Sequence, residues 1–219
     1  GSQAWGEMHE VGLVGACTIA FEHEIGAIRA NGGEILSVPS SDPARGADYA
    51  ARHGIGRGAA DLADLLGEPG LDAVHVSTTN EKHRPQALAA IAGGKHVLCE
   101  KPLAMTLGEA AEMARAAGAA GLVLATNHHP RNAGGHLAIR DLIAGGRIGR
   151  MLSTRMFHAV HLPPRLRGWQ IRDAIAGGDV IPDITMHDAD TVRFHLGEDP
   201  VEVVATSGTS GMGEGSRTA

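Results

Sequence analysis

The stretch Lys95-His96-Val97-Leu98-Cys99-Glu100-Lys101-Pro102 decides how this sequence folds. Its first half is an apolar run that predicts a short buried strand, and the run then stops at an acid, a base and a proline. Because proline has no backbone N–H and cannot extend a central ladder, the strand must end near Cys99. In a parallel α/β sheet, ligands bind at the carboxyl ends of the strands, so Lys101 is expected in that crevice. From these residues alone, a salt-bridged Glu–Lys pair on an ordinary loop is the alternative.

The composition excludes several classes of function. The 219 residues carry a net charge of −6 at pH 7, which offers no basic surface for nucleic acid. The two cysteines, Cys17 and Cys99, make no disulfide framework and suit a reducing cytosol. No apolar run approaches the roughly 18 residues of a membrane span, and no signal peptide precedes the first strand. We therefore expect a soluble, cytoplasmic α/β protein with no nucleic-acid or membrane partner.

Apolar runs alternate with helical patterns on both sides of the opening stretch. Besides the strand that ends near Cys99, the runs predict buried strands at 11–14, 34–38, 72–76 and 122–126. The segments between the strands predict helices at 18–30, 44–53, 61–66, 83–92 and 107–117. This alternation indicates a doubly wound parallel sheet of the Rossmann type. We assign residues 9–127 to a dinucleotide-binding domain.

A glycine turn follows the first predicted strand. Gly15-Ala16-Cys17-Thr18-Ile19-Ala20 has the outline of the G-x-G-x-x-G/A fingerprint, with Cys17 at the second glycine position. The first glycine makes the tight turn, and the last small residue lets the helix pack on the strand. The N-terminus of that helix would attract a phosphate. The motif is weak by itself and gains weight from the βαβ alternation around it.

The end of the second predicted strand indicates which dinucleotide binds. An acid usually meets the adenine ribose roughly 20 residues past the glycine turn. Here Ser40 and Ser41 stand at that place, with Arg45 one turn later. Two hydroxyls and a guanidinium would bind a 2′-phosphate, which a carboxylate would repel. We therefore favour NADP (NADPH) and keep NAD as possible, although Ser-Ser-Asp-Pro is also ordinary turn and helix-start chemistry.

A run of hydroxyl and amide side chains follows the strand predicted at 72–76. This run is Ser77-Thr78-Thr79-Asn80-Glu81, and it stands at a carboxyl end of the expected parallel sheet. It could contact the ribose and nicotinamide side of a dinucleotide, or it could serve only as the N-cap region of the next helix.

The pattern changes after Asn127, which predicts a second domain over residues 128–219. It has helices at 133–144 and 183–196, a long loop that carries Trp169, and strands at 151–160 and 201–205. The alternation in the first of these strands is typical of an antiparallel sheet. In the last helix Asp183, His187 and Asp190 fall at i, i+4 and i+7 and share one face. Asp183 could instead be the N-cap, and a lone helical histidine is more often structural.

The 13 histidines raise the question of a metal site. His128-His129 and His158-x-x-His161 lack the carboxylate or thiol neighbours of a good zinc site, and Cys17 and Cys99 lie on separate strands. We therefore expect no metal.

With these motifs in place, the sequence resembles the Gfo/Idh/MocA (glucose-fructose oxidoreductase / inositol dehydrogenase / rhizopine catabolism) family. The resemblance extends from Val11 to about Met212, and its most specific runs are the glycine turn, 76–81, 94–106, 126–129 and 157–160. It implies hydride transfer between NADP or NAD and a sugar, here the reduction of a sugar ketone. It also implies that Lys101 and His187 are the catalytic pair and that Asp183 helps to position the substrate.

The resemblance further implies a set of cofactor-binding positions, to which the turn itself adds Gly15. These positions are Ala16, Cys17, Thr18, Ile19, Ser40, Ser41, Arg45, Ser77, Thr78, Thr79, Asn80, Glu81, Lys82, Glu100, Lys101, Asn127, Trp169 and Gln170. Two alternative functions are open: a dinucleotide-binding sensor without catalysis, and an NAD-dependent glycosidase on the same fold.

The resemblance implies that the second domain carries an open antiparallel sheet of some six or more strands, of which this chain contains about two. We expect an α+β domain that lacks the C-terminal part of its sheet. A sheet with an unpaired edge and an uncovered apolar face favours association, so a homo-oligomer through this domain is possible.

Overall fold

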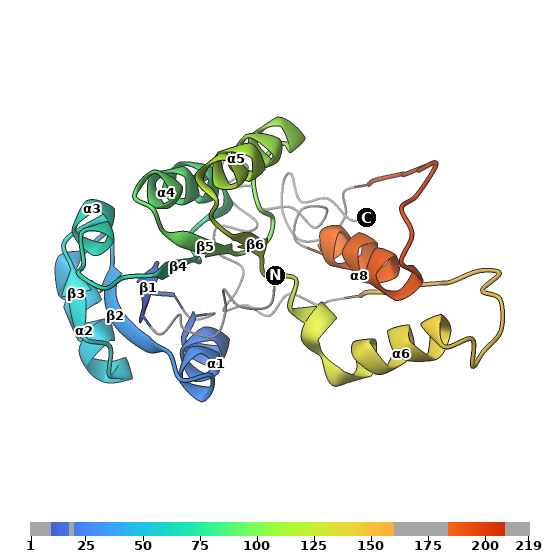
Figure 1. The fold of residues 1–219 in the computed structure, drawn as a ribbon, viewed down its shortest axis with the longest axis horizontal. Helices are drawn as coiled ribbons and strands as arrows, with labels where there is room; N and C mark the ends of the chain where they lie inside the picture. The colour runs from blue at the N-terminus through green and yellow to red at the C-terminus, as the bar shows by residue number, and fades with distance from the viewer. Residues whose placement is uncertain (1–9, 18–19, 160–183, 209–219) are drawn as a thin grey trace. The chain divides into compact units, whose positions relative to one another are not determined.

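The computed structural model describes residues 10–17, 20–159 and 184–208. The backbone divides into two compact units, Gly1–Asn127 and His128–Ala219 (Figure 1).

A six-stranded parallel sheet forms the centre of the first unit. Its strands are β1 (Glu10–Val14), β2 (Glu34–Pro39), β3 (Arg57–Ala59), β4 (Ala73–Val76), β5 (His96–Cys99) and β6 (Leu124–Thr126). They lie in the order β3-β2-β1-β4-β5-β6, so the direction of winding reverses between β1 and β4. At such a reversal the loops at the carboxyl ends diverge and leave a crevice for a ligand.

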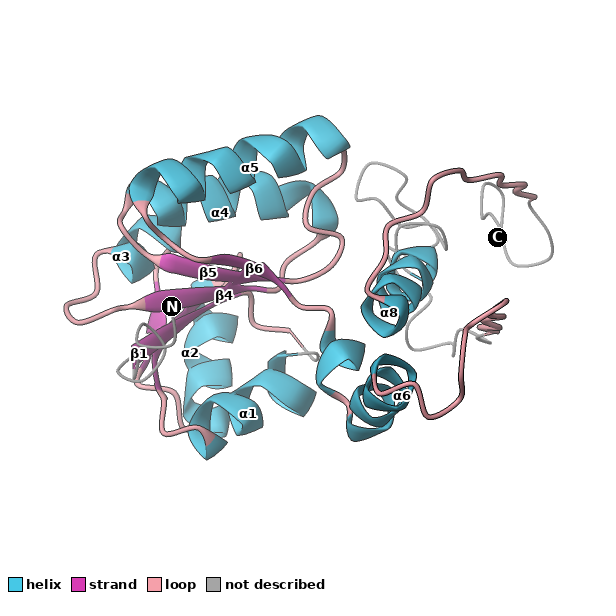
Figure 2. Cartoon of the chain, turned by 45° about the vertical axis from the view of Figure 1, so that its right-hand side comes forward, coloured by secondary structure: helices cyan, strands magenta, loops and turns pink. Residues whose placement is uncertain are grey.

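Helices cover both faces of this sheet (Figure 2). One face carries α3 (Leu62–Leu66), α4 (Asn80–Ala92) and α5 (Leu107–Ala120), and its core is centred on Leu65, Val74, Val97 and Met113. The other face carries α1 (Ile25–Ala30) and α2 (Pro43–His53), and its core is centred on Leu13, Ile35 and Tyr49. The strands are apolar on both sides because both sides are buried.

The predicted Rossmann pattern is confirmed in the first unit, with three differences. The edge strand β3 was not predicted, and α4 begins at Asn80 rather than at His83. The helix after the glycine turn starts as a π-helical segment, η1 (Ala20–Glu24), and continues as α1. Thr18 and Ile19, where that helix was expected to begin, lie outside the described residues.

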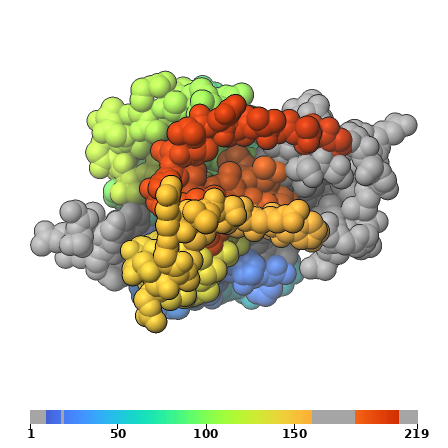
Figure 3. Space-filling model, turned by 90° about the vertical axis from the view of Figure 1, so that its right-hand side faces the viewer, coloured from blue at the N-terminus to red at the C-terminus, as the bar shows by residue number. Residues whose placement is uncertain are grey.

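The described part of the second unit contains helices joined to long loops. It contains a short 3₁₀ segment, η2 (His129–Asn132), and the helices α6 (Gly134–Ala144) and α8 (Met186–Leu196). The strands predicted at 151–160 and 201–205 are wrong as far as the structure describes them, because residues 151–159 and 201–205 form no strand. Their backbone runs along the surface (Figure 3), and side chains such as Leu152, Phe157 and Val204 are exposed. A strand exists only when a neighbouring strand pairs with its backbone groups, and no described segment pairs with these two.

Within the described residues, no helix has both the length and the apolar character that a membrane span requires.

Candidate active site

The glycine turn packs directly against the end of β4. Gly15 has a φ of 121°, a conformation that favours glycine. A Cβ at this position would stand 3.1 Å from the Thr78 side chain and 3.2 Å from the carbonyl oxygen of Ser77. The Cys17 thiol donates to Ser77 Oγ at 3.4 Å and accepts from the Ala20 N–H at 3.4 Å. The cysteine at the second glycine position therefore joins the turn to the neighbouring strand end.

Two side chains of α2 hold the same turn from the other side. The Arg45 guanidinium donates to the carbonyl of Ala16 at 2.9 Å, and the Tyr49 hydroxyl donates to the carbonyl of Cys17 at 2.8 Å. Burial, together with the nearby Cys17, raises the pKa of Tyr49 to about 12, so this hydroxyl keeps its proton. Arg45 thus has a structural role in addition to its predicted contact with a 2′-phosphate.

The Ser40–Ser41 segment ends β2 and leads into α2. Asp42 is the N-cap of that helix, and its carboxylate accepts from the backbone N–H groups of Ala44 and Arg45 at 2.9 and 3.5 Å. Ser40 Oγ accepts from the Asp42 N–H at 3.4 Å. The Asp42 carboxylate, next to the two serines in the sequence, is therefore engaged in helix capping.

The polar run after β4 begins α4 and is tied down by its own hydrogen bonds. Thr78 Oγ1 donates to Gln86 at 2.5 Å, and Thr79 Oγ1 donates to Glu81 at 2.6 Å. Thr79 is the N-cap residue of α4, but its side chain makes no capping hydrogen bond. Asn80 is buried at the first helical position, and Lys82 is exposed. Both open interpretations of this run therefore keep support, because it begins a helix and also lies at the crevice.

His83 fastens this run to the loop that carries Lys101. Its ring is fully buried, with Nδ1 2.8 Å from the carbonyl oxygen of Pro102 and Nε2 3.2 Å from that of Thr78. One nitrogen of a neutral imidazole can donate to one of these carbonyls. Burial lowers the pKa of His83 and keeps the ring neutral, despite the opposing effect of the two carbonyls.

We expect His83→Ala to lower the free energy of unfolding by about 2–4 kcal/mol, because it leaves a cavity and an unsatisfied buried carbonyl. Urea unfolding at neutral pH measures this effect, and exposed His23→Ala is the control. The folded-state pKa of His83 is depressed, so its contribution is complete above the unfolded pKa of about 6.5 and declines as the pH falls below it. The difference between wild type and variant should therefore shrink at about pH 5. A variant as stable as the control would contradict the role of His83.

Glu100 lies in a buried polar network at the ends of β4, β5 and β6. The backbone N–H of Glu100 donates to the Val76 carbonyl at 2.8 Å, and that of Asn127 donates to the Cys99 carbonyl at 2.7 Å. Asn127 Nδ2 donates to Glu100 Oε1 at 2.6 Å and to Glu24 Oε1 at 3.0 Å. Burial raises the pKa of Glu100, but the nearby His75, the Asn127 amide and Lys101 outweigh it, so the net shift is downward. Glu100 is therefore ionised beside Lys101.

In the second unit, His187 lies among other histidines. Its ring meets those of His128 and His129 edge to face, with centroids 5.6 and 5.0 Å away. Asp190, one turn later on α8, pairs with Arg131 of η2 through two contacts of 2.5 and 2.7 Å. Burial raises the pKa of Asp190, but Arg131 outweighs it and lowers the pKa overall. The shared face of His187 and Asp190 is thus packed on η2.

Several predicted site residues lie outside the described residues: Thr18, Ile19, Trp169, Gln170 and Asp183. Lys101 and His187 belong to different compact units, and their catalytic pairing stays a prediction.

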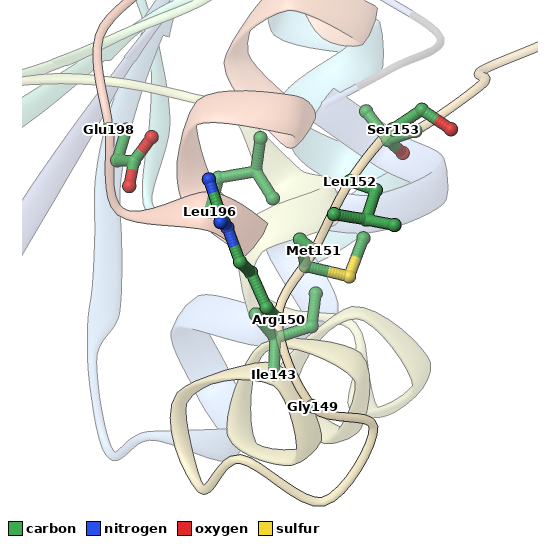
Figure 4. A pocket seen from close by; sticks show the side chains of 9 residues that line it. Ile143, Gly149, Arg150, Met151, Leu152, Ser153, Leu196 and Glu198 are labelled. Carbon is green, nitrogen blue, oxygen red and sulfur yellow. The ribbon is translucent and has the colours of Figure 1, made fainter.

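A pocket of about 480 Å³ lies in the second unit, between the end of α6, the end of α8 and residues 149–154 (Figure 4). Ile143, Met151 and Leu196 contribute apolar side chains to its lining, and Arg150 and Glu198 contribute charged ones. None of the predicted site residues lines it.

Sequence analysis missed three contributions to this site. It gave no role to His83, and it did not join His75 or Glu24 to Glu100. His83 at the start of a predicted helix and Glu24 inside another gave no signal in the sequence, because their partners lie far away along the chain. It considered His128-His129 only as possible metal ligands. Their ring contacts with His187 could not be predicted, because His187 is far from them in the sequence.

The reversal point of the sheet, the glycine turn and the polar strand ends define a Rossmann-type dinucleotide-binding domain. Residues 9–128 match the family model described as an oxidoreductase family with an NAD-binding Rossmann fold, and residues 136–218 match the model of the GFO/IDH/MocA C-terminal domain. The chain belongs to the Gfo/Idh/MocA oxidoreductase family.

Individual members of the family are similar to this chain over most of its length. The 1,5-anhydro-D-fructose reductase of Ensifer adhaerens is 60% identical over 207 residues, which cover 94% of this chain and 62% of the reductase. A levoglucosan dehydrogenase in complex with NADH and levoglucosan has a TM-score of 0.75 at 27% identity, over 88% of this chain and 55% of that one. A 3-ketoreductase from Actinomadura kijaniata in complex with NADP has a TM-score of 0.59 at 28% identity, over 64% and 43% of the two chains. The chain thus spans less than two thirds of the length of these relatives.

Proposed function

We propose that this chain belongs to an NADPH-dependent oxidoreductase that reduces a sugar ketone such as 1,5-anhydro-D-fructose. The observation that carries the proposal is the 60% identity to the Ensifer adhaerens reductase over 94% of the chain. The levoglucosan and inositol dehydrogenases are only about 30% identical to this chain, so the sequence favours the reductase.

The residues of the first unit fit a dinucleotide. The positive φ of Gly15 and the 3.1 Å that a Cβ would leave to Thr78 make a turn that only glycine forms without strain. In this family fold the turn faces the pyrophosphate, and Ser77 after β4 and Asn127 after β6 offer polar groups to the remainder of the cofactor. When bound, NADPH supplies the hydride.

Preference for NADPH over NADH rests on the end of β2. Ser40 and Ser41 offer hydroxyl groups, the Asp42 carboxylate is used in capping, and Arg45 lies between this segment and the glycine turn. This arrangement provides hydroxyl and guanidinium donors, which suit a 2′-phosphate.

Arg45→Ala should weaken NADPH binding about tenfold or more, since a hydrogen bond between charged partners contributes about 1.5–3 kcal/mol. NADH binding should change little. Because Arg45 also supports the Ala16 carbonyl, Tyr49→Phe is the matched control: it removes the other support of the same turn and should affect both cofactors alike. Fluorescence titration with each cofactor measures the effect. An equal loss of both cofactors in Arg45→Ala would assign Arg45 to the turn alone.

In the proposed reaction Lys101 polarises the substrate carbonyl and stabilises the alkoxide that hydride addition forms. His187 donates the proton that neutralises this alkoxide, and Asp183 orients the substrate or the imidazole. A lysine ammonium suits the electrostatic task, whereas an imidazole, with an ordinary pKa of about 6.5, suits proton donation near neutral pH.

The remaining assignments belong to the same proposal. Residues 9–127 are the dinucleotide-binding domain, and residues 128–219 are part of an α+β substrate domain with an open antiparallel sheet. The protein acts in the cytoplasm and self-associates through that sheet.

Steady-state consumption of NADPH over a panel of sugar ketones tests the proposed reaction. We expect loss of NADPH absorbance that depends on the sugar ketone and matches the alcohol formed. A glycosidase that recycles its cofactor would show no net consumption, and a sensor would bind NADPH without turnover. Either result would contradict the proposal.

A further inference from the structure

The network around Glu100 brings together three side chains that are typical metal ligands. Glu24 of η1, His75 of β4 and Glu100 after β5 each place one ligand atom within 4.8 Å of the other two. Nε2 of His75 is 3.5 Å from Glu100 Oε1, a contact without hydrogen-bond geometry. The three residues come from separate elements of the first unit, so their proximity results from the fold of that unit.

His75 is the unusual member of this group. Its side chain is 1% exposed, and within the described residues neither of its ring nitrogens has a hydrogen bond. Buried polar groups in native proteins nearly always have such partners, and an unsatisfied buried group destabilises the fold. A histidine in the interior of a parallel strand, facing two carboxylates, therefore calls for a partner of positive charge.

We propose that Glu24, His75 and Glu100 bind a first-row divalent cation of the Zn²⁺ type. One imidazole nitrogen and two carboxylate oxygens form a mixed donor set that suits such an ion, whereas Mg²⁺ prefers oxygen ligands and retains several waters. Bond lengths to zinc are about 2.0–2.2 Å for these atoms, so the ligand atoms move closer together on binding. Glu24 is only half-buried, and rotation of its side chain supplies this movement and an entry path.

Asn127 adapts to the cation. In the present arrangement its Nδ2 donates to both carboxylates and so separates two like charges. Rotation of the carboxamide turns Oδ1 toward the cation. This oxygen then completes a tetrahedral site as the fourth ligand, beside one imidazole nitrogen and two carboxylate oxygens. This proposal differs from the sequence-based expectation of no metal. That expectation weighed only the histidine pairs close together in the sequence and the two cysteines.

Isothermal titration of the full chain with ZnCl₂, after removal of metal with EDTA, tests the site near neutral pH. We compare wild type with His75→Gln and Glu24→Gln. His96→Gln is the matched control, because His96 lies on the neighbouring strand β5 and its Nδ1 accepts from the Val123 N–H at 3.0 Å. A parallel titration with MgCl₂ tests the donor set.

We expect one saturable zinc site in wild type and in His96→Gln, with affinity at least about tenfold weaker in His75→Gln and in Glu24→Gln. Zinc should also raise the melting temperature of wild type and of the control, but not of Glu24→Gln. Mg²⁺ should show no binding that depends on His75. Glu24→Gln keeps the test decisive if His75→Gln does not fold, because Glu24 lies outside the sheet.

Two outcomes overturn the proposal. If wild type binds no stoichiometric zinc, Glu24, His75 and Glu100 form only a polar network with Asn127. If both variants bind zinc as wild type does, the ion occupies other histidines of the chain. The titration uses no sugar and no cofactor, so its failure leaves the proposed reductase activity untouched, and failure of that activity leaves the zinc site untouched.

Discussion

Replacing Lys101 with methionine is expected to lower kcat/KM for the reduction of a sugar ketone by about 10²–10³-fold. This is the loss that follows removal of one preorganised group that stabilises a developing oxyanion. Methionine keeps an unbranched apolar side chain of nearly the same length but removes the charge. The main loss should fall on the step in which the carbonyl becomes an alkoxide, while the affinity for NADPH changes much less. Single-turnover kinetics and a separate NADPH titration measure the two quantities.

Lys95→Met is the matched control for this experiment. Lys95 precedes β5 and Lys101 follows it, so the two lysines stand at opposite ends of the same strand. Lys95 Nζ donates to the Leu71 carbonyl at 2.7 Å, which is a structural contact. Its loss should cost stability of about 1 kcal/mol and leave kcat/KM nearly unchanged. Equal kcat/KM values for Lys101→Met and Lys95→Met would show that Lys101 has no role in the reaction.

His187→Ala is expected to lower kcat by about 10²–10⁴-fold, the range attributed to a positioned proton donor. The alkaline limb of the pH–rate profile should be lost with it, because the proton would no longer come from an imidazole. Added imidazole should restore part of the activity by occupying the space that the substitution leaves. A merely structural histidine would not give this rescue, so the rescue separates proton transfer from positioning.

The control for this variant is His129→Ala, which removes a ring that meets His187 edge to face at 5.0 Å. It should change the packing around His187 but keep the alkaline limb. If His187→Ala retains the wild-type kcat and pH profile, the proton comes from another group, and Lys101 is the first candidate.

The parallel sheet could be read from local sequence because each strand is buried on both faces. Val11 to Val14 and Val97 to Cys99 are short apolar runs, and such runs bounded by glycine or proline have few other structures available to them. The strand β3 gave no such signal. It forms because Gly56 and Gly58 let the chain pass where a Cβ would meet Leu36 O at 2.5 Å and Ala47 N at 2.7 Å.

Residues 151–159 and 201–205 show the opposite error. The alternation of apolar and polar residues over 151–160 predicted one strand and the stretch 201–205 another, yet the described residues form none there. Periodicity records which face of a segment is suited to burial, but a strand also needs a partner for its backbone hydrogen bonds. That partner is a tertiary property, and the pattern of one segment does not contain it.

By itself the sequence determined most elements of the Rossmann unit, with β3 as an exception, together with the glycine turn and the place of Lys101 at a strand end. Helix periodicity, apolar runs and the missing N–H of proline are local properties, so they can be read along the chain. Only the tertiary structure brought His83 to the Pro102 carbonyl and set Glu24, His75 and Glu100 within 4.8 Å of one another. Such contacts depend on strand order and on register, which put Val76 beside Cys99 and so bring the ends of β4 and β5 together. Sequence separation carries no information about these contacts until the sheet has formed.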